Sequence, residues 1–362
     1  MLFFDPQSPQ QQTSPVATPT PTQSGNGNLA PPDNPPGDRN TDSCVPRPGQ
    51  TEVVHNYRNA GPAPGTLPFR WMYGSRVAAI NRDPRIQLVQ YNEDTCVLRQ
   101  NVCVHWAAPF TYLLFGNKGA LLIDTGATAD AAHYPLRATV DAIMLRWSQM
   151  TRKKVPLTVV FTSGEDIAQN QGAAQFAGRP ETMLVPRPLQ AMKDFYRLSS
   201  NWPESGAKVD LGDRVIDVIP TPGAHKDGLT FYDSYTHLLF TGDLLFPGRI
   251  NISHDRDYLA SLERLQRWKQ THNVKWLLGG HIGMQFVPGK DCPRFATHKP
   301  YERVLQMEPA LLDDAVASTR EVVGKKLALI RPDFILLNGV SPDEKAQLFP
   351  PGVPNIAAPY PF

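Results

Sequence analysis

The chain has 362 residues, which is enough for a large buried core. Hydrophobic residues make up 41% and charged residues 19% of the chain, as in ordinary globular proteins. The net charge of +2 argues against a nucleic-acid partner, and no apolar run approaches the roughly 18 residues of a membrane helix.

The first part of the chain is rich in Pro, Gln, Thr, Ser, Asn and Gly. Such a composition buries too little apolar surface to offset the entropy lost on ordering, so we expect a disordered tail over residues 1–48. We expect one folded domain over residues 49–299. Residues 300–362 are expected to form C-terminal helices and a tail that pack on this domain.

The cysteines leave the redox compartment open. There are four, Cys44, Cys96, Cys103 and Cys292, and an even count permits two disulfides. A bridge between Cys96 and Cys103 would join a hairpin, and free thiols are the alternative. The tail favours an extracytoplasmic or secreted protein over a cytoplasmic one.

Apolar spacing predicts strands that alternate with helices. In the first half of the domain we expect strands over residues 86–100, 111–128, 157–162 and 183–186, and helices over 129–150, 166–177 and 189–199. Gly116 to Gly119 separate two apolar runs, which indicates a hairpin. In the second half we expect strands over 214–223, 229–233, 237–245 and 274–281, a helix over 257–271, and one or two closing helices over 303–330. This mixture is typical of a layered α/β domain.

Four predicted strands end in a turn that carries a polar side chain able to bind a metal. "ALLIDTG" contains Asp124, "VIPTPGAH" ends at His225, "HLLFTGD" ends at Asp243 and "KWLLGGH" ends at His281. Each string is weak evidence alone. Their order and spacing together are specific.

From about residue 87 to residue 307 this pattern resembles the metallo-β-lactamase superfamily of hydrolases. The resemblance implies an αββα four-layer sandwich and one or two bound metal ions, usually zinc, at one edge of the sheets. It implies ligands from an H-x-H-x-D-H loop, a His after T-P-G, the Asp of T-G-D and a late His after Gly. "DYLASLERLQRW" and "GGHIGMQFVPGKD" resemble the subgroup with a C-terminal helical extension.

The loop after "VVFT" departs from this pattern, because it contains no histidine. Matched without gaps, Ser163 and Glu165 replace the first two histidines, and Ile167 and Ala168 replace the Asp and the third His. A shortened loop would instead keep Asp166 as the family's Asp, which orients the attacking water. The sequence leaves both registers open.

The other ligand positions match the family pattern to different degrees. Asp243 and His281 match the family's ligands without a shift, whereas Ala224 stands where the T-P-G histidine belongs. His225 comes one residue late, and adjacent side chains on an extended chain point in opposite directions. We interpret Asp124 as a structural carboxylate that braces neighbouring loops.

Two interpretations of "TSGEDIAQ" follow. Glu165 and Asp166 can act as oxygen ligands, which together with Asp243 and His281 would hold one metal. Alternatively, Ser163 and Asp166 form a capping box that opens the helix behind them.

The resemblance therefore predicts a metal-dependent hydrolase of a small ester, lactone, amide or phosphoester, with an altered single-metal site and Asp166 as its catalytic residue. The implied cofactor is zinc, or Mn²⁺ or Mg²⁺ if carboxylates dominate. The alternative is a catalytically inactive relative, a pseudoenzyme without metal that binds a ligand or a protein. We expect a small-molecule partner, and the sequence predicts no oligomeric state.

Overall fold

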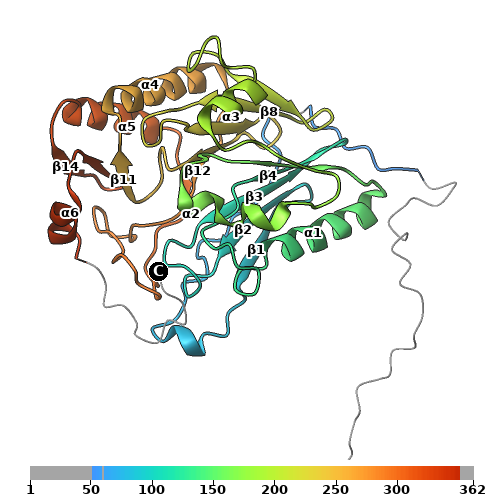
Figure 1. Cartoon of the computed structure of the whole chain (residues 1–362), viewed down its shortest axis with the longest axis horizontal. Helices are drawn as coiled ribbons and strands as arrows, with labels where there is room; N and C mark the ends of the chain where they lie inside the picture. Colours follow the sequence, from blue (N-terminus) through green and yellow to red (C-terminus); the bar gives the residue numbers. More distant parts are fainter. Residues whose placement is uncertain (1–50, 59–60, 351–362) are drawn as a thin grey trace, which may run out of the picture. The chain divides into compact units, whose positions relative to one another are not determined.

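Two six-stranded sheets lie at the centre of the described part of the chain (Figure 1). The computed structural model describes residues 51–58 and 61–350, so the tail predicted over 1–48 and the last residues, 351–362, lie outside the described residues. The first sheet has the order β1 (Ile86–Asn92), β2 (Thr95–Gln100), β3 (Phe110–Phe115), β4 (Ala120–Ile123), β5 (Leu157–Val160), β6 (Thr182–Leu184). The second has the order β13 (Gln306–Met307), β12 (Trp276–Gly279), β10 (Leu238–Gly242), β9 (Leu229–Asp233), β8 (Val215–Pro220), β7 (Ala207–Asp210).

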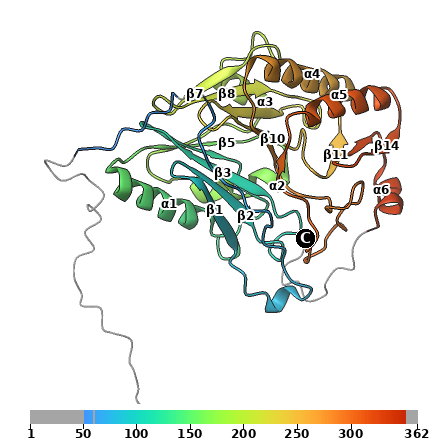
Figure 2. The same ribbon diagram turned by 180° about the vertical axis from the view of Figure 1, so that it is seen from behind.

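Helices cover the outer faces of both sheets. Among the described residues, the α-helices are α1 (Leu136–Thr151), α2 (Ile167–Asn170), α3 (Leu189–Phe195), α4 (Asp255–Thr271), α5 (Leu311–Val322) and α6 (Pro342–Leu348), and the 3₁₀ helices are η1 (Ala78–Ile80) and η2 (Gln171–Phe176). Figures 1 and 2 show α4 and α5 side by side, on the opposite side of the strands from α1. None of the helices in the described ranges has the length and apolarity needed to cross a membrane.

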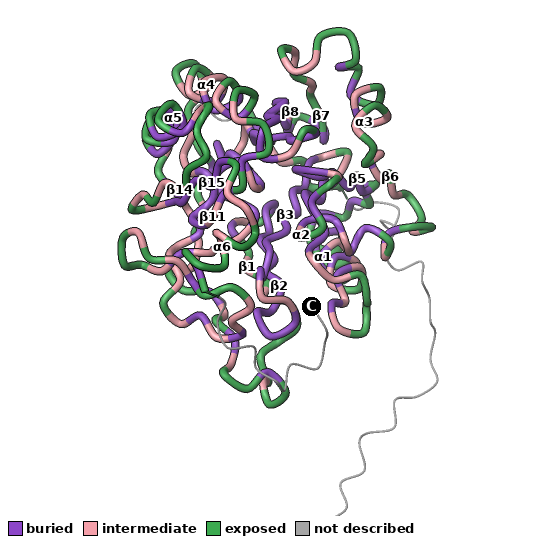
Figure 3. The backbone as a smooth tube through the Cα atoms, turned by 60° about the vertical axis from the view of Figure 1, so that its left-hand side comes forward, coloured by how far each residue is buried: buried purple, intermediate pink, exposed green. Residues whose placement is uncertain are grey.

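Three buried clusters separate these four layers. Along β3, Tyr112 and Leu114 belong to the cluster between the two sheets, whereas Leu113 and Phe115 belong to the cluster beneath α1. This alternation is the period of two that a strand imposes on its side chains. Figure 3 shows most of the strand backbone as buried.

The third cluster lies between the second sheet and its helices. Leu239 and Leu277 of this sheet pack with Leu262 of α4 and Leu312 of α5. All four side chains are fully buried. The αββα four-layer sandwich expected from the sequence is therefore confirmed.

The C-terminal extension contains strands as well as helices. β14 (Leu327–Ile330) and β15 (Ile335–Asn338) form a three-stranded sheet with β11 (Arg249–Ile252), in the order β11-β15-β14. The prediction of helices alone over residues 303–330 was wrong, because Leu327–Ile330 pairs with β15 instead of continuing α5. The sequence pattern did not reveal that β15 would be the partner of this strand.

Two predicted helices also differ in the structure. The helix expected over 129–150 begins only at Leu136, after Pro135, because Asp130 accepts hydrogen bonds from the Ala132 amide and the His133 ring and so forms a turn. The helix expected over 166–177 changes to 3₁₀ at Gln171.

The disulfide expected as one alternative does not form. Cys96, Cys103 and Cys292 are free, buried thiols, and Cys44 lies outside the described residues. Cys96 pairs with Leu113 across the β2–β3 ladder, while Cys103 lies beyond the end of β2, where its sulfur accepts a hydrogen bond from the Ser75 amide. The two thiols therefore follow one another along the chain and do not face each other across a hairpin.

Candidate metal centre and substrate cavity

Three side chains from different strand ends meet at the edge of the sandwich. Asp166, His225 and Asp243 each offer a donor atom, and these atoms all lie within 4.8 Å of one another. Asp166 follows β5, His225 follows β8 and Asp243 follows β10. We call these three residues the donor set.

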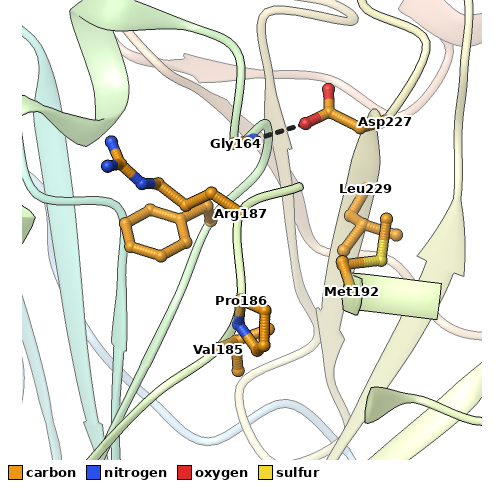
Figure 4. A pocket seen from close by; sticks show the side chains of 8 residues that line it. Gly164, Val185, Pro186, Arg187, Met192, Asp227 and Leu229 are labelled. Carbon is orange, nitrogen blue, oxygen red and sulfur yellow. Dashed lines mark hydrogen bonds between the residues drawn. The ribbon is translucent and has the colours of Figure 1, made fainter. Parts of the chain in front are cut away.

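Asp227 fixes the loop that carries Asp166. Its carboxylate accepts hydrogen bonds from the Ser163 hydroxyl at 2.6 Å and from the backbone amides of Gly164 at 2.7 Å and Glu165 at 3.1 Å. Figure 4 shows the bond between Gly164 and Asp227. Asp227 is itself buried, so a single carboxylate determines the course of residues 163–165.

Asp166, and not Ser163, is the N-cap of the helix behind the loop. Its Oδ1 accepts a hydrogen bond from the Ala168 amide at 2.8 Å, while the Ser163 hydroxyl accepts from the Asp166 amide one turn earlier. The capping box predicted from Ser163 was therefore wrong in its position. Oδ2 of Asp166 is buried and has no hydrogen-bond partner among the described residues.

A tight turn brings His225 to the donor set. Gly223 has a φ of +140°, and its amide donates to the His225 carbonyl at 2.9 Å, so residues 223–225 are not extended. Ala224 is buried against the α4 side of the second sheet, and Nε2 of His225 lies 3.7 Å from Oδ2 of Asp166. The alternation argument that placed His225 away from the site does not apply to a turn.

Asp243 and His281 lie next to each other. Nδ1 of His281 is 3.3 Å from Oδ1 of Asp243, but it has no hydrogen-bond partner in the part of the chain that the structure describes. Nε2 of Gln169 donates to the same Asp243 oxygen at 3.1 Å. The ring of Phe246 packs on His281 with 4.1 Å between centroids, which fixes the imidazole at the cavity wall.

The pKa values of the two carboxylates in the donor set shift in opposite directions. Burial, and next the charge of Asp243, raises the pKa of Asp166 well above its ordinary value. Burial also opposes ionisation of Asp243, but His281 and His225 hold its pKa below the ordinary range. One proton shared between two close carboxylates is the usual consequence, and a cation between them would replace it.

Asp124 braces the loops, as the sequence suggested. Its two oxygens accept hydrogen bonds from the amide and the hydroxyl of Thr162, both at 2.8 Å. Burial raises its pKa to about 8, although the bonds from Thr162 oppose this shift. Asp124 is fully buried and lies outside the donor set.

Glu165 is not brought to the donor set. Its carboxylate lies 2.7 Å from the ammonium of Lys226 and is 43% exposed. Sequence reasoning missed Asp227 and Gln169, which hold Asp166 and Asp243 in place. Asp227 lies only two residues after His225, so the altered T-P-G motif contained the signal without showing its partner.

A cavity of about 1180 Å³ adjoins this site. Asp166, Asp243 and His281 form part of its wall, which is otherwise mostly apolar and includes Phe246 and Ile282. His105 also lines it, and burial, followed by the charge of Lys299, lowers the pKa of His105 to about 4. His105 is therefore a neutral ring at pH 7.

Comparison with known proteins agrees with this arrangement. The family model of the metallo-beta-lactamase superfamily matches residues 163–280, which include the whole donor set. This matched segment is similar to the metallo-β-lactamase superfamily, the family that the sequence pattern resembles. The acyl-coenzyme A thioesterase MBLAC2 of Homo sapiens is 25% identical over 207 residues, 54% of this chain and 72% of that protein, and the Bos taurus protein of the same name is 24% identical over the same lengths. A solved metallo-beta-lactamase from Pontibacter korlensis covers 65% of this chain and 99% of its own, with 14% identity and a TM-score of 0.42.

The donor set has the chemistry that a divalent metal of this superfamily requires. Zinc accepts imidazole nitrogen and carboxylate oxygen, and both are present here. The buried, unpartnered Oδ2 of Asp166 is a further reason, because such an atom costs free energy unless something binds it. Although the H-x-H-x-D-H histidines are absent, one carboxylate and one shifted histidine converge on Asp243.

Proposed function

We propose that this protein is a metal-dependent hydrolase of carboxylic thioesters or esters. The observation that carries the proposal is the donor set of Asp166, His225 and Asp243 beside a cavity of about 1180 Å³. The thioester part rests on the MBLAC2 relatives, which are acyl-coenzyme A thioesterases by name.

Asp166 through Oδ2, together with His225 and Asp243, would hold one divalent ion, for which zinc is the first choice and Mn²⁺ the second. When bound there, the ion supplies Lewis acidity and makes a water molecule more acidic. Asp166 is the residue we expect to orient the attacking water. His281 lines the cavity beside Asp243, where it can pass a proton to the leaving atom.

The overall reaction balances with water as the only second substrate. The water oxygen forms a bond to the acyl carbon, and the bond from that carbon to the leaving sulfur or oxygen breaks. The leaving sulfur or oxygen takes one proton of the water. The remaining hydroxyl group becomes part of the carboxylic acid product. The apolar cavity wall would hold the acyl chain and limit the access of other water molecules.

The metal content of the purified full-length protein tests this proposal. After incubation with Zn²⁺ or Mn²⁺ and removal of the excess, we expect about one equivalent by elemental analysis, together with turnover of acyl thioesters that a chelator abolishes. Asp243→Asn should lose both the metal and the turnover. Glu165→Gln is the matched control, because Glu165 faces Lys226, and it should keep both.

One observation favours a second function, a ligand-binding module without catalysis. The Gln169 amide donates to Asp243, so one donor of the set already has a protein partner. Absence of metal in the wild-type chain, even with excess Zn²⁺ and Mn²⁺, would overturn the hydrolase proposal and support this alternative.

A further inference from the structure

The wall of the cavity carries a second group of charged residues, which are all basic. Arg249 begins β11, Arg294 lies between β12 and β13, and Lys345 belongs to α6. All three line the same cavity as Asp166 and Asp243. We call Arg249, Arg294 and Lys345 the cation cluster.

The cation cluster is only partly neutralised. Arg249 pairs with Asp291 at 3.0 Å, whereas Lys345 donates to the neutral amide oxygen of Asn251 at 2.6 Å. Arg294 lies over two aromatic rings, 4.6 Å from the centroid of Phe295 and 5.5 Å from that of Trp106. Within residues 51–58 and 61–350, no carboxylate pairs with Arg294 or Lys345.

The charge of Arg294 acts on both other members of the cation cluster. Burial lowers the pKa of Arg249. The ion pair with Asp291 opposes this shift, and the charge of Arg294 adds to it. Burial and the charge of Arg294 also lower the pKa of Lys345. Charges of one sign on a half-buried wall cost free energy, and a bound anion would relieve that cost.

Neighbouring charged residues already have partners. Lys299 lines the cavity but donates to the Trp106 carbonyl and lies 3.7 Å from Glu302. Glu344, adjacent to Lys345, binds Ser341 and Lys326. Lys299 is therefore structural, and Glu344 does not neutralise the cation cluster.

We infer that the cation cluster binds a phosphate group on the leaving part of the substrate while the donor set lies at the scissile bond. Two guanidinium groups and one ammonium match a multiply charged phosphate better than a single carboxylate, because arginine forms paired hydrogen bonds to phosphate oxygens. Arg294 and Lys345 lie beyond residues 163–280, the segment that the family model matches, so two of the three cations come from the part of the chain after that segment. The link to the scissile bond rests on the proposed function.

Pyrophosphate binding tests the anion site without any turnover. Calorimetry on the metal-depleted full-length protein in EDTA should show pyrophosphate binding that weakens with salt. Arg294→Gln with Lys345→Gln should weaken it at least tenfold. The matched control is Arg267→Gln with Lys325→Gln, which removes two exposed charges outside the cavity and should change nothing.

No binding to the wild type, or unchanged binding to the Arg294→Gln, Lys345→Gln variant, would overturn the inference. The single variant Arg294→Gln, at an exposed residue, repeats the test if the double variant unfolds. This result is independent of the hydrolase proposal, because neither metal nor turnover enters it.

A pair of substrates tests the link to the scissile bond. Acetyl-coenzyme A and S-acetyl-N-acetylcysteamine have the same thioester, but only the first has phosphates. In the metal-loaded enzyme, the cation-cluster variant should raise KM at least tenfold for the first and leave the second unchanged. An unchanged KM for both would show that the cluster binds a free anion and not the substrate, and an equal rise for both would show that the variant disturbs the cavity without a specific contact to the phosphates. Either result would overturn the link to the substrate. Turnover of neither would contradict the proposed function and leave the pyrophosphate result intact.

Discussion

At the scale of single residues, the site depends on a carboxylate that lies outside the donor set. Asp227 receives three hydrogen bonds from residues 163–165, and the next residue in the chain is Asp166. Residues that orient a metal ligand typically change metal affinity by about 10- to 100-fold when they are lost. Asp227 is thus a positioning residue.

Asp227→Ala should therefore lower the affinity for Zn²⁺ by about 10- to 100-fold while the metal ligands themselves remain. It should also destabilise the fold by about 1–3 kcal/mol, because one buried and two partly buried donors lose their acceptor. Competition with a zinc-sensitive dye and urea unfolding measure the two effects. Asp227→Asn is the informative companion, since it keeps acceptor oxygen and should recover part of both. Full zinc affinity in Asp227→Ala would show that the loop does not depend on this carboxylate.

The sequence predicted some of these residues and not others, for physical reasons. Asp243 and Asp124 follow short buried strands, where position along the chain fixes position in space. The place of His225 was harder to predict, because the direction of its side chain depends on the positive φ of Gly223. A pattern of residue types does not reveal a backbone angle. Asp227 and Gln169 act through contacts across 62 or more residues, and such partners cannot be recognised in one sequence.

At the scale of elements, the turn over residues 221–228 and helix α4 support each other. The carbonyl of Gly223 accepts the amides of Ser253 and His254 at 2.9 Å, directly before α4 begins. A Cβ on Gly223 would lie 2.3 Å from Cα of Tyr258. Glycine is required here both by its φ of +140° and by the closeness of the helix backbone.

Gly223→Ala should destabilise the protein by about 3 kcal/mol or more, since backbone strain and steric overlap with α4 add. Gly178→Ala is the matched control: it has a φ of +70°, but nothing lies within 4 Å of an added Cβ. That variant should lose about 1–2 kcal/mol from backbone strain alone. Thermal unfolding of both variants gives the difference. Equal losses would mean that α4 moves away at no cost and that the turn does not hold His225 through this contact.

The elements differ in how well local patterns predict them. Most strands of both sheets and α4 were predicted, because burial on one or two faces leaves a clear period in the sequence. The edge strands β7 and β13 of the second sheet were not predicted. β15 was missed because its pairing with β11 joins residues 86 positions apart, as in Arg249 with Ile335. β14 was missed because its side chains are exposed or only half-buried. The C-terminal extension, which carries Lys345 of the cation cluster, is thus the part of the fold that sequence patterns describe least.

At the scale of the whole described part, the buried side chain of Arg214 links the two sheets. Arg214, before β8 of the second sheet, donates to the carbonyls of Asp94 at 2.7 Å and Phe115 at 2.8 Å in the first sheet. Its guanidinium also binds Asp233 at the end of β9, and both side chains are fully buried. Although burial alone raises it, Arg214 and the bonds from Thr236 hold the pKa of Asp233 below its ordinary value.

Asp233→Asn should destabilise the protein by about 3–5 kcal/mol at pH 7, because it leaves a buried guanidinium without its anion.

The pH dependence of this effect has a definite sign. Since the pKa of Asp233 is depressed on folding, its contribution is fully present above the unfolded value of about 4 and is lost as the pH falls through the folded value. The difference between wild type and variant, measured by urea unfolding, should therefore be largest at neutral pH and shrink in acid. Asp213→Asn, which removes the exposed partner of Arg58, should show little effect at any pH. A difference that stays constant from pH 7 into acid would show that packing, and not charge, joins the sheets at this point.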